Sequence, residues 1–336
     1  MKSLLILKIL LVFIILQVQL FANNEALEKV SLQLQWKHQF EFAGFYIAKE
    51  KGFYRNLGLD VEIKELELDM NTVDEVLENR STYGTTYSSI ILEKSKGKDL
   101  VLLSAILQSS PHVLVSLKSS GIKSIKDFKD KRIMIANNNA NNAPFESMLH
   151  ANDISIKDMT VVKQTFKLQD LIDKKADISS VFSTNELYEL DKQNIAYDIW
   201  DPKEYGFDFY DVILFTSQSE LDNNPQRVKK FNKASLKGWE YAFENIEETV
   251  ELILKKYNTQ NKTKEALIYE ANALKKLAYL NTKKVGDINK QNIKRIYDMY
   301  NLMGLVKNKI VFDDFIYNPN FLILNEKEKA FLKKRP

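Results

Sequence analysis

The sequence predicts an α/β protein of two lobes that are joined by two strand connections and completed by a helical C-terminal portion. Strand-like and helix-like segments alternate twice, first over residues 30–107 and again over residues 112–199. After one more apolar strand at 212–216, the chain has almost only helix periodicity. The length of 336 residues also favours two domains or one large one.

The first unit has the alternating or apolar pattern of strands at residues 30–36, 59–63, 83–86 and 100–107. A helix is expected over 41–53, where Phe42, Phe45 and Tyr46 fall on one side. Thr72 is the expected cap of a second helix, and a third begins at Ser88 or Ser89. This alternation predicts a parallel sheet with helices on both faces.

The second unit has strand patterns at residues 112–117, 132–136, 161–165, 178–182 and 195–199, with helices between them. The helical portion that follows covers residues 226–243, 246–257, 263–278 and 289–303. We therefore expect the chain to cross to a second lobe near 115 and to return near 214. Residues 30–114 and 215–317 form lobe 1, residues 115–214 form lobe 2, and residues 318–336 form a C-terminal tail. This path of the chain predicts a cleft between the two lobes.

The amino terminus has the pattern of a secretory signal peptide. Lys2 and Lys8 flank an apolar stretch over residues 4–20, and Ala22 precedes a polar segment. Residues 1–22 are therefore expected to be a signal peptide that is cleaved after Ala22. An uncleaved anchor helix is the alternative, because the stretch approaches the length that spans a bilayer.

Composition excludes several classes of protein. With 45% hydrophobic and 28% charged residues the chain is globular rather than disordered. The absence of cysteine excludes disulfides, thiolate metal sites, a Cys nucleophile and a lipid-attachment Cys. A net charge of +3 gives no electrostatic case for nucleic acid, so a small or weakly charged partner is expected.

Candidate binding residues lie where predicted strands end, because ligands of open α/β sheets collect at the carboxyl ends of strands. Trp36 ends the first predicted strand, where the chain turns into the first helix, and offers a flat face for stacking, although a core Trp under the loop is the alternative. Tyr87 and Ser88 follow the strand at 83–86, where hydroxyl groups could meet a polar ligand. Helix capping by Ser88 explains part of that segment equally well.

In the second unit, Asn138 and Asn139 lie in an Asn-rich loop before a helix led in by Pro144. A bare turn is the alternative for that loop. Asn185 and Glu186 follow the strand at 178–182, although Glu186 could simply favour a helix N-terminus. Two further candidates, Tyr210 and Asp211, lead into the return strand. No pair of groups suited to acid–base catalysis is evident, and no metal site is expected.

Residues 34–54 (LQWKHQFEFAGFYIAKEKGFY), together with GLDV at 58–61, resemble the opening of the thiamine-pyrimidine (NMT1/THI5-like, SsuA/THI5-like) family of periplasmic solute-binding proteins. Further similar segments are QSSP at 108–111, TNE at 184–186, YGFDFY at 205–210 and ASLKGWEYA at 234–242. The resemblance implies a two-lobed clamshell fold. It implies cleft positions for Trp36, Tyr87, Glu186 and Tyr210. Through the QSSP segment it also adds Gln108 to the candidate ligand-binding residues.

The function that this resemblance implies is capture of a small heterocycle, above all a thiamine pyrimidine precursor, in the periplasm for an ABC importer. A monomer without a cofactor is expected. Ligand sensing for a membrane receptor kinase or cyclase is one alternative. Thiamine pyrimidine synthase is another, but the positions of its family's Lys and His are Thr86 and Ile90 here, and its Cys-rich iron-binding stretch falls on residues 208–211. The chain is therefore not expected to be an enzyme.

Overall fold

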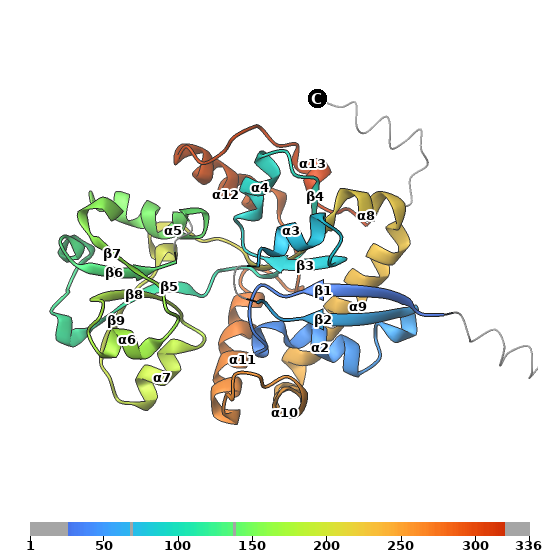
Figure 1. The fold of residues 1–336 in the computed structure, drawn as a ribbon, viewed down its shortest axis with the longest axis horizontal. Coiled ribbons are helices and arrows are strands. Elements are labelled where there is room, and N and C mark those ends of the chain that lie inside the picture. Colours follow the sequence, from blue (N-terminus) through green and yellow to red (C-terminus); the bar gives the residue numbers. More distant parts are fainter. Residues whose placement is uncertain (1–25, 68–69, 137–138, 320–336) are drawn as a thin grey trace, which may run out of the picture.

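A computed structural model describes residues 26–67, 70–136 and 139–319 and confirms the two-lobed α/β architecture (Figure 1). Each lobe contains one five-stranded sheet with helices packed against it. The predicted signal peptide and all of the predicted tail beyond residue 319 lie outside the described residues.

The sheet of the first lobe has the strand order β2-β1-β3-β10-β4. Its strands are β1 (Glu28–Gln33), β2 (Leu59–Lys64), β3 (Tyr83–Thr86), β4 (Leu100–Leu107) and β10 (Asp211–Ser217). The bounds of β3 and β4 agree with those predicted. Strand β1 is parallel to β2 and β3, whereas β10 is antiparallel to β3 and β4.

The sheet of the second lobe has the corresponding order β7-β6-β8-β5-β9. Its strands are β5 (His112–Leu117), β6 (Arg132–Ile135), β7 (Thr160–Lys163), β8 (Ile178–Phe182) and β9 (Tyr197–Trp200). Strand β6 is parallel to β7 and β8, and β5 is antiparallel to β8 and β9.

The prediction of parallel sheets was therefore wrong, because both sheets are mixed. The reason is the path of the connections. The chain leaves the first sheet after Leu107, enters the second at His112, leaves it at Trp200 and re-enters the first at Asp211. The entering strands β5 and β10 start at the edge where the parallel strands end, so they run in the opposite direction. The two crossings also lie before residues 115 and 214.

Helices of the first lobe come from both ends of the chain. They are α2 (Ala43–Glu50), α3 (Thr72–Leu77), α4 (Ile90–Ser95), α8 (Gln218–Asn223), α9 (Pro225–Glu244), α10 (Ile246–Lys256), α11 (Lys264–Ala278), α12 (Lys290–Leu302) and α13 (Phe312–Phe315). The helix predicted over 41–53 is instead a 3-10 turn, η1 (Phe40–Phe42), followed by the shorter α2. Asn71 rather than Thr72 caps α3, since its Oδ1 accepts the N–H groups of Val73 and Asp74.

The second lobe contains α5 (Asn139–His150), α6 (Leu168–Ile172) and α7 (Glu186–Lys192). Pro144 lies inside α5 rather than at its start. The helix begins earlier than predicted, in a segment where the Asn142 side chain donates a hydrogen bond to the carbonyl of Ala136 at 2.7 Å. The remaining 3-10 turns are η2 (Arg55–Leu57), η3 (Lys118–Ser120), η4 (Ile125–Phe128), η5 (Ile156–Asp158) and η6 (Pro202–Tyr205).

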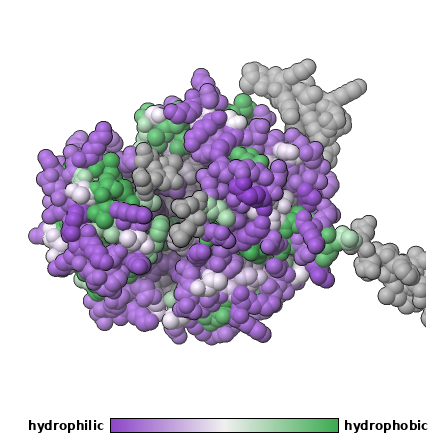
Figure 2. Space-filling model, in the orientation of Figure 1, coloured by the Kyte–Doolittle hydropathy of each residue, from purple (hydrophilic) through white to green (hydrophobic). Residues whose placement is uncertain are grey.

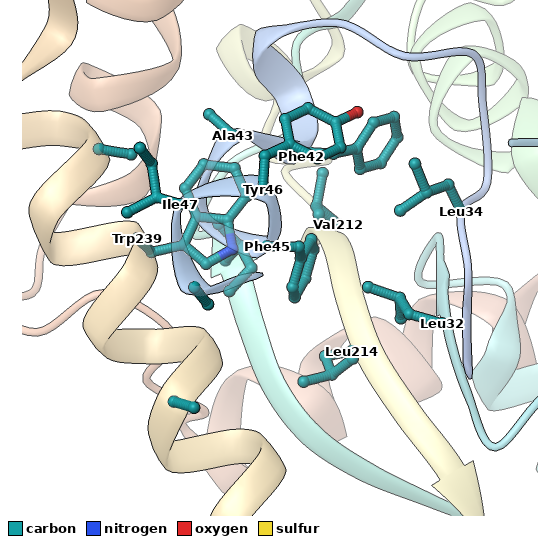
Figure 3. Packing of buried hydrophobic residues seen from close by; sticks show 14 of the residues in the cluster. Leu32, Leu34, Phe42, Ala43, Phe45, Tyr46, Ile47, Val212, Leu214 and Trp239 are labelled. Carbon is teal, nitrogen blue, oxygen red and sulfur yellow. The ribbon is translucent and has the colours of Figure 1, made fainter. Parts of the chain in front are cut away.

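The largest part of the core lies in the first lobe, between α2, α9 and the sheet. Figure 3 shows Phe45 and Tyr46 of α2 packed beside Trp239 of α9, with Val212 and Leu214 of β10 opposite. The two helices approach closely because glycines meet at their contact. A Cβ atom added to Gly238 would lie 2.0 Å from the carbonyl oxygen of Gly44.

The face of the molecule in Figure 2 is mostly hydrophilic, with small separate hydrophobic groups. Among the described residues, no helix has both the length and the hydropathy needed to span a bilayer.

Candidate functional site

A cavity of about 500 Å³ lies between the two lobes. Its walls come from the carboxyl ends of the parallel strands of both sheets, where sequence reasoning placed the candidate residues. The segments after β1 and β3 contribute from the first lobe, and those after β6 and β8 contribute from the second. Both interlobe connections also line the cavity, through Ser110 and residues 207–211.

Most of the predicted site residues meet at this cavity. Those that line it are Trp36, Tyr87, Ser88, Asn185, Glu186, Tyr210 and Asp211. Gln108 does not line the cavity, because its side-chain amide donates to the carbonyl groups of Ala105 and Asp287, each at 2.9 Å. Asn138 lies outside the described residues, and only the backbone of Asn139 is described, at the start of α5.

Two predicted residues have structural partners of their own. The Ser88 hydroxyl donates to the carbonyl of Tyr210 at 2.8 Å and so joins the β3–α4 segment to the return connection. Oε2 of Glu186 accepts the backbone N–H of Phe182 at 2.9 Å, so this carboxylate satisfies a backbone donor beside its own helix. Burial raises the pKa of Glu186, against the lowering effect of that hydrogen bond.

The floor of the cavity, defined here as Gln35, Glu41 and Asp211, belongs to the first lobe. Nε2 of Gln35 lies 3.1 Å from Oδ1 of Asp211 and 3.4 Å from Oε1 of Glu41. Because an ionised carboxylate accepts and does not donate, the Gln35 amide directs its nitrogen toward Asp211. The oxygen of that amide, Oε1, is buried and accepts no hydrogen bond from the described residues.

Asp211 occupies the first position of β10, directly after the return connection. Its Oδ2 accepts the Ser110 hydroxyl at 2.8 Å and its Oδ1 accepts the N–H of Val212 at 2.7 Å. Val212 has a φ of 46°, a left-handed conformation that is strained for a β-branched residue. Burial raises the pKa of Asp211 to about 6, against the lowering effect of these hydrogen bonds.

Glu41 is 3% exposed and lies in η1. Burial raises its pKa well above the usual range, and the negative charges of Asp211 and Glu270 raise it further. Glu270 of α11 is fully buried behind it, and its Oε1 accepts the N–H of Glu41 at 2.9 Å. Lys262 lies 3.7 Å from the other oxygen of Glu270 and donates to the Asn185 side chain of the second lobe.

The opposite wall of the cavity carries a group of aromatic side chains beside polar ones such as Gln164 and Glu186. His112, at the start of β5, lies between Phe145 and Phe182, with ring centroids 4.6 and 5.2 Å away. Burial lowers the pKa of His112 to about 4, so its imidazole is neutral at physiological pH. Phe166 extends from the segment after β7 and meets the edge of Trp36 at a centroid distance of 4.8 Å, directly across the two lobes.

Sequence reasoning did not single out Gln35, Glu41 or His112. Glu41 stands between Phe40 and Phe42, so the segment reads as an amphipathic helix rather than as a binding loop. Its signal was a charged residue within an otherwise apolar run. His112 begins a strand that is buried for most of its length, and only the crossing between lobes brings it to the cavity.

The described residues contain no cluster of three or more His, Asp or Glu side chains arranged to hold a metal ion. The position expected for a cofactor-binding Lys is Thr86, a hydroxyl in the cavity wall. Lys262, which does line the cavity, is held by Asn185 and Glu270. A covalent amine site therefore does not fit the residues at that position.

Comparison with known families gives a match to the model described as NMT1/THI5 like, over residues 39–249. A formylaminopyrimidine-binding protein of Halalkalibacterium halodurans is 22% identical over 268 residues, which cover 78% of this chain and 81% of that protein. A riboflavin-binding protein, RibY, of Chloroflexus aurantiacus is 23% identical over 238 residues, which cover 68% of this chain and 66% of that protein.

Among solved structures, the periplasmic aliphatic sulphonate-binding protein SsuA of Escherichia coli superposes with a TM-score of 0.66. The sequence identity is 13%, and the alignment covers 87% of this chain and 92% of that one. At this identity the likeness shows the fold alone, and the two-lobed arrangement is common to both.

Proposed function

This chain belongs to the NMT1/THI5-like family, and from that premise we propose that it is a periplasmic solute-binding protein that delivers an aminopyrimidine to an ABC importer. The observation that carries the proposal is the floor of the cavity. Gln35, Glu41 and Asp211 offer hydrogen-bond acceptors at the base of a cleft that two lobes enclose. An aminopyrimidine supplies the exocyclic N–H donors that these acceptors require.

Aromatic side chains around the floor suit a flat ring. Trp36, Tyr87 and Tyr210 line the cavity from the first lobe and the return connection, and Phe166 lines it from the second lobe. Stacking and edge contacts with such rings add binding free energy beyond that of the buried area. The name of the formylaminopyrimidine-binding relative supports the same ligand class.

The charge of the cavity argues against a sulfonate as the main ligand. An anion placed on the floor would face the carboxyl groups of Glu41 and Asp211. Lysines on the wall are partly neutralised, since Lys96 pairs with Glu93 and Lys203 pairs with Asp201, each at 2.6 Å. We therefore expect this chain to differ in ligand from the sulphonate-binding protein whose fold it has.

The synthase alternative requires an amine, a sacrificial imidazole and an iron site. Thr86 and Ile90 occupy the Lys and His positions, and residues 208–211 contain no thiolate. Covalent binding of pyridoxal phosphate to the purified protein, with release of a pyrimidine in the presence of iron, would overturn this part of the proposal.

The test is native mass spectrometry of the protein purified without denaturation, followed by calorimetry with 4-amino-5-hydroxymethyl-2-methylpyrimidine and its N-formylaminomethyl analogue. We expect a bound or added pyrimidine at one molecule per chain, with aliphatic sulfonate as the negative control. A protein that binds the sulfonate and ignores both pyrimidines would contradict the proposed ligand. Permease and ATPase genes beside the coding sequence would support import, whereas a kinase or cyclase gene would favour sensing.

A further inference from the structure

The hydrogen bonds of the floor leave acceptors in excess. Gln35 is 3% exposed and uses its amide nitrogen on both Glu41 and Asp211. Its Oε1 is left without a donor among the described residues, although it is buried beside the cavity. An unsatisfied buried acceptor costs free energy, and a ligand N–H would remove that cost.

The charge of the floor also lacks a nearby counter-ion. No ion pair within 4.0 Å involves Asp211 or Glu41 among the described residues. Only hydrogen bonds from Ser110, Val212 and Gln35 stabilise the ionised form of Asp211. Lys262, whose charge acts on Glu41, lies against Glu270 and Asn185 instead. The floor can therefore accept one positive charge without displacing a cation of the protein.

The shape of the site selects among cations. Trp36 and Tyr87 line the cavity on the side of the floor, so the ligand next to the carboxyl groups should be flat. A compact ammonium group would hold its N–H donors in three directions and would leave these ring faces unused. An amidinium group instead carries its N–H donors in one plane, as guanidinium does, so it leaves a flat edge for the carboxyl groups.

We infer that the Gln35–Glu41–Asp211 floor is a subsite for the N–H edge of a flat, positively charged amidinium-type head group, such as the protonated form of an aminopyrimidine. Asp211 supplies the negative charge, and Oε1 of Gln35 accepts a second N–H. The inference rests on the proposed function only in placing the ligand in this cavity, because aminopyrimidine binding by itself does not require a charged ligand.

The experiment compares benzamidine with benzamide, which share a ring and a planar head group but differ in charge. Calorimetry on the purified protein at pH 8 should show benzamidine binding at least about tenfold tighter, as expected for a charge-assisted contact. Asp211→Asn should reduce that ratio to about twofold or less. Asp298→Asn removes the same single negative charge from a half-exposed position of α12, and it should leave the ratio unchanged.

Three outcomes would overturn the inference: benzamide binding as tightly as benzamidine, neither compound binding, or an unchanged ratio in Asp211→Asn. Should Asp211→Asn fail to fold, Glu41→Gln must lower the ratio in its place, and an unchanged ratio there would also overturn it. The proposed function is tested separately, by pyrimidine binding. Pyrimidine binding without charge preference would remove only the subsite, whereas benzamidine preference without pyrimidine binding would remove only the proposed ligand.

Discussion

Across the cavity, the first lobe presents the buried carboxyl and amide groups of the floor beside Trp36 and Tyr87. The second lobe presents a cluster of rings around the neutral imidazole of His112, beside the polar side chains of Asn185 and Glu186. The floor carboxyl groups of the first lobe have fixed orientations, because Ser110 and Val212 donate to Asp211, and the amides of Gln39 and Gln35 donate to Glu41. On the second lobe, ring contacts place His112 between Phe145 and Phe182.

From this difference we infer which lobe would anchor a ligand and which would cover it. Polar groups that already have their orientation lose little conformational entropy on binding, so they suit an anchor. Aromatic faces accept small shifts in position, so they suit a lobe that closes over the ligand. Contacts between the lobes, such as Trp36 with Phe166 and Lys262 with Asn185, would stabilise a closed form if a ligand shifts the lobes between two positions.

The largest expected effect concerns the rigidity of the anchoring lobe. Gly238→Ala would place a Cβ atom 2.0 Å from the carbonyl of Gly44 and force α9 away from α2, which follows the turn carrying Glu41. We expect a loss of about 3 kcal/mol in the free energy of unfolding, measured by urea denaturation. Gly52→Ala meets open space at a φ of +73° and should cost only about 1 kcal/mol. Equal losses would mean that the close helix contact is unimportant.

The second prediction compares the two rings that meet across the cavity. Trp36→Ala should weaken binding of 4-amino-5-hydroxymethyl-2-methylpyrimidine by about 1–3 kcal/mol, because the anchoring lobe loses its ring face. Phe166→Ala should cost about 0.5–1 kcal/mol, since this side chain is 62% exposed and belongs to the cover. Calorimetry on both variants measures the difference. A larger loss in Phe166→Ala would reverse the assignment of anchor and cover.

The third prediction is a pH dependence that belongs to the floor. Burial raises the folded-state pKa of Asp211 to about 6, so the folded protein binds this proton more tightly than the unfolded chain. Between roughly pH 4 and pH 6, Asp211 therefore makes the free energy of unfolding fall as the pH rises. Cation binding has the opposite sign, because it needs the carboxylate.

Benzamidine affinity should accordingly fall as the pH drops below about 6, by up to about tenfold per pH unit. Asp211→Asn should flatten this profile. The titratable groups on which the charge of Asp211 acts are Glu41, Tyr87 and Tyr300, and burial lowers the pKa of His112 on the other lobe to about 4. Calorimetry from pH 5 to pH 8 measures the profile, and a slope that persists in Asp211→Asn would assign it to Glu41 instead.

The smallest expected effect concerns the covering lobe. His112→Phe keeps the ring contacts with Phe145 and Phe182 and removes one polar contact with a ligand. We expect a loss of about 1 kcal/mol in pyrimidine affinity, and the same difference at pH 6 and pH 8, because His112 is neutral at both. His112→Gln, which retains a polar group, should recover part of the loss. A greater loss in His112→Gln would show that the ring matters more than the polar contact.

Much of the fold follows from local sequence patterns. The segments 83–86, 100–107, 112–117 and 178–182 have the bounds of β3, β4, β5 and β8, and of these 100–107 and 112–117 are short, mainly apolar runs. Strand direction was not predictable in this way. Whether β10 runs parallel or antiparallel depends on where the chain re-enters the sheet, which no local pattern contains.

The candidate site was predictable where a residue follows a strand, as Trp36, Tyr87 and Glu186 do. It was not predictable where burial decides the role. Glu41 resembles part of a helix until its surroundings are known, and Gln108 satisfies its amide on two carbonyl groups that lie far apart in the sequence. Similarity to a family indicates positions along the chain and leaves side-chain orientation open.

The position of β10 between β3 and β4 has a consequence for the order in which the protein is made. All five strands of the second sheet lie within residues 112–200. A ribosome therefore completes the strands of that sheet while the first sheet still lacks β10. The lobe that starts first in the chain is finished last. Asp211 is synthesised only after all the strands of the second sheet, so a growing chain contains the covering lobe before its charged anchor.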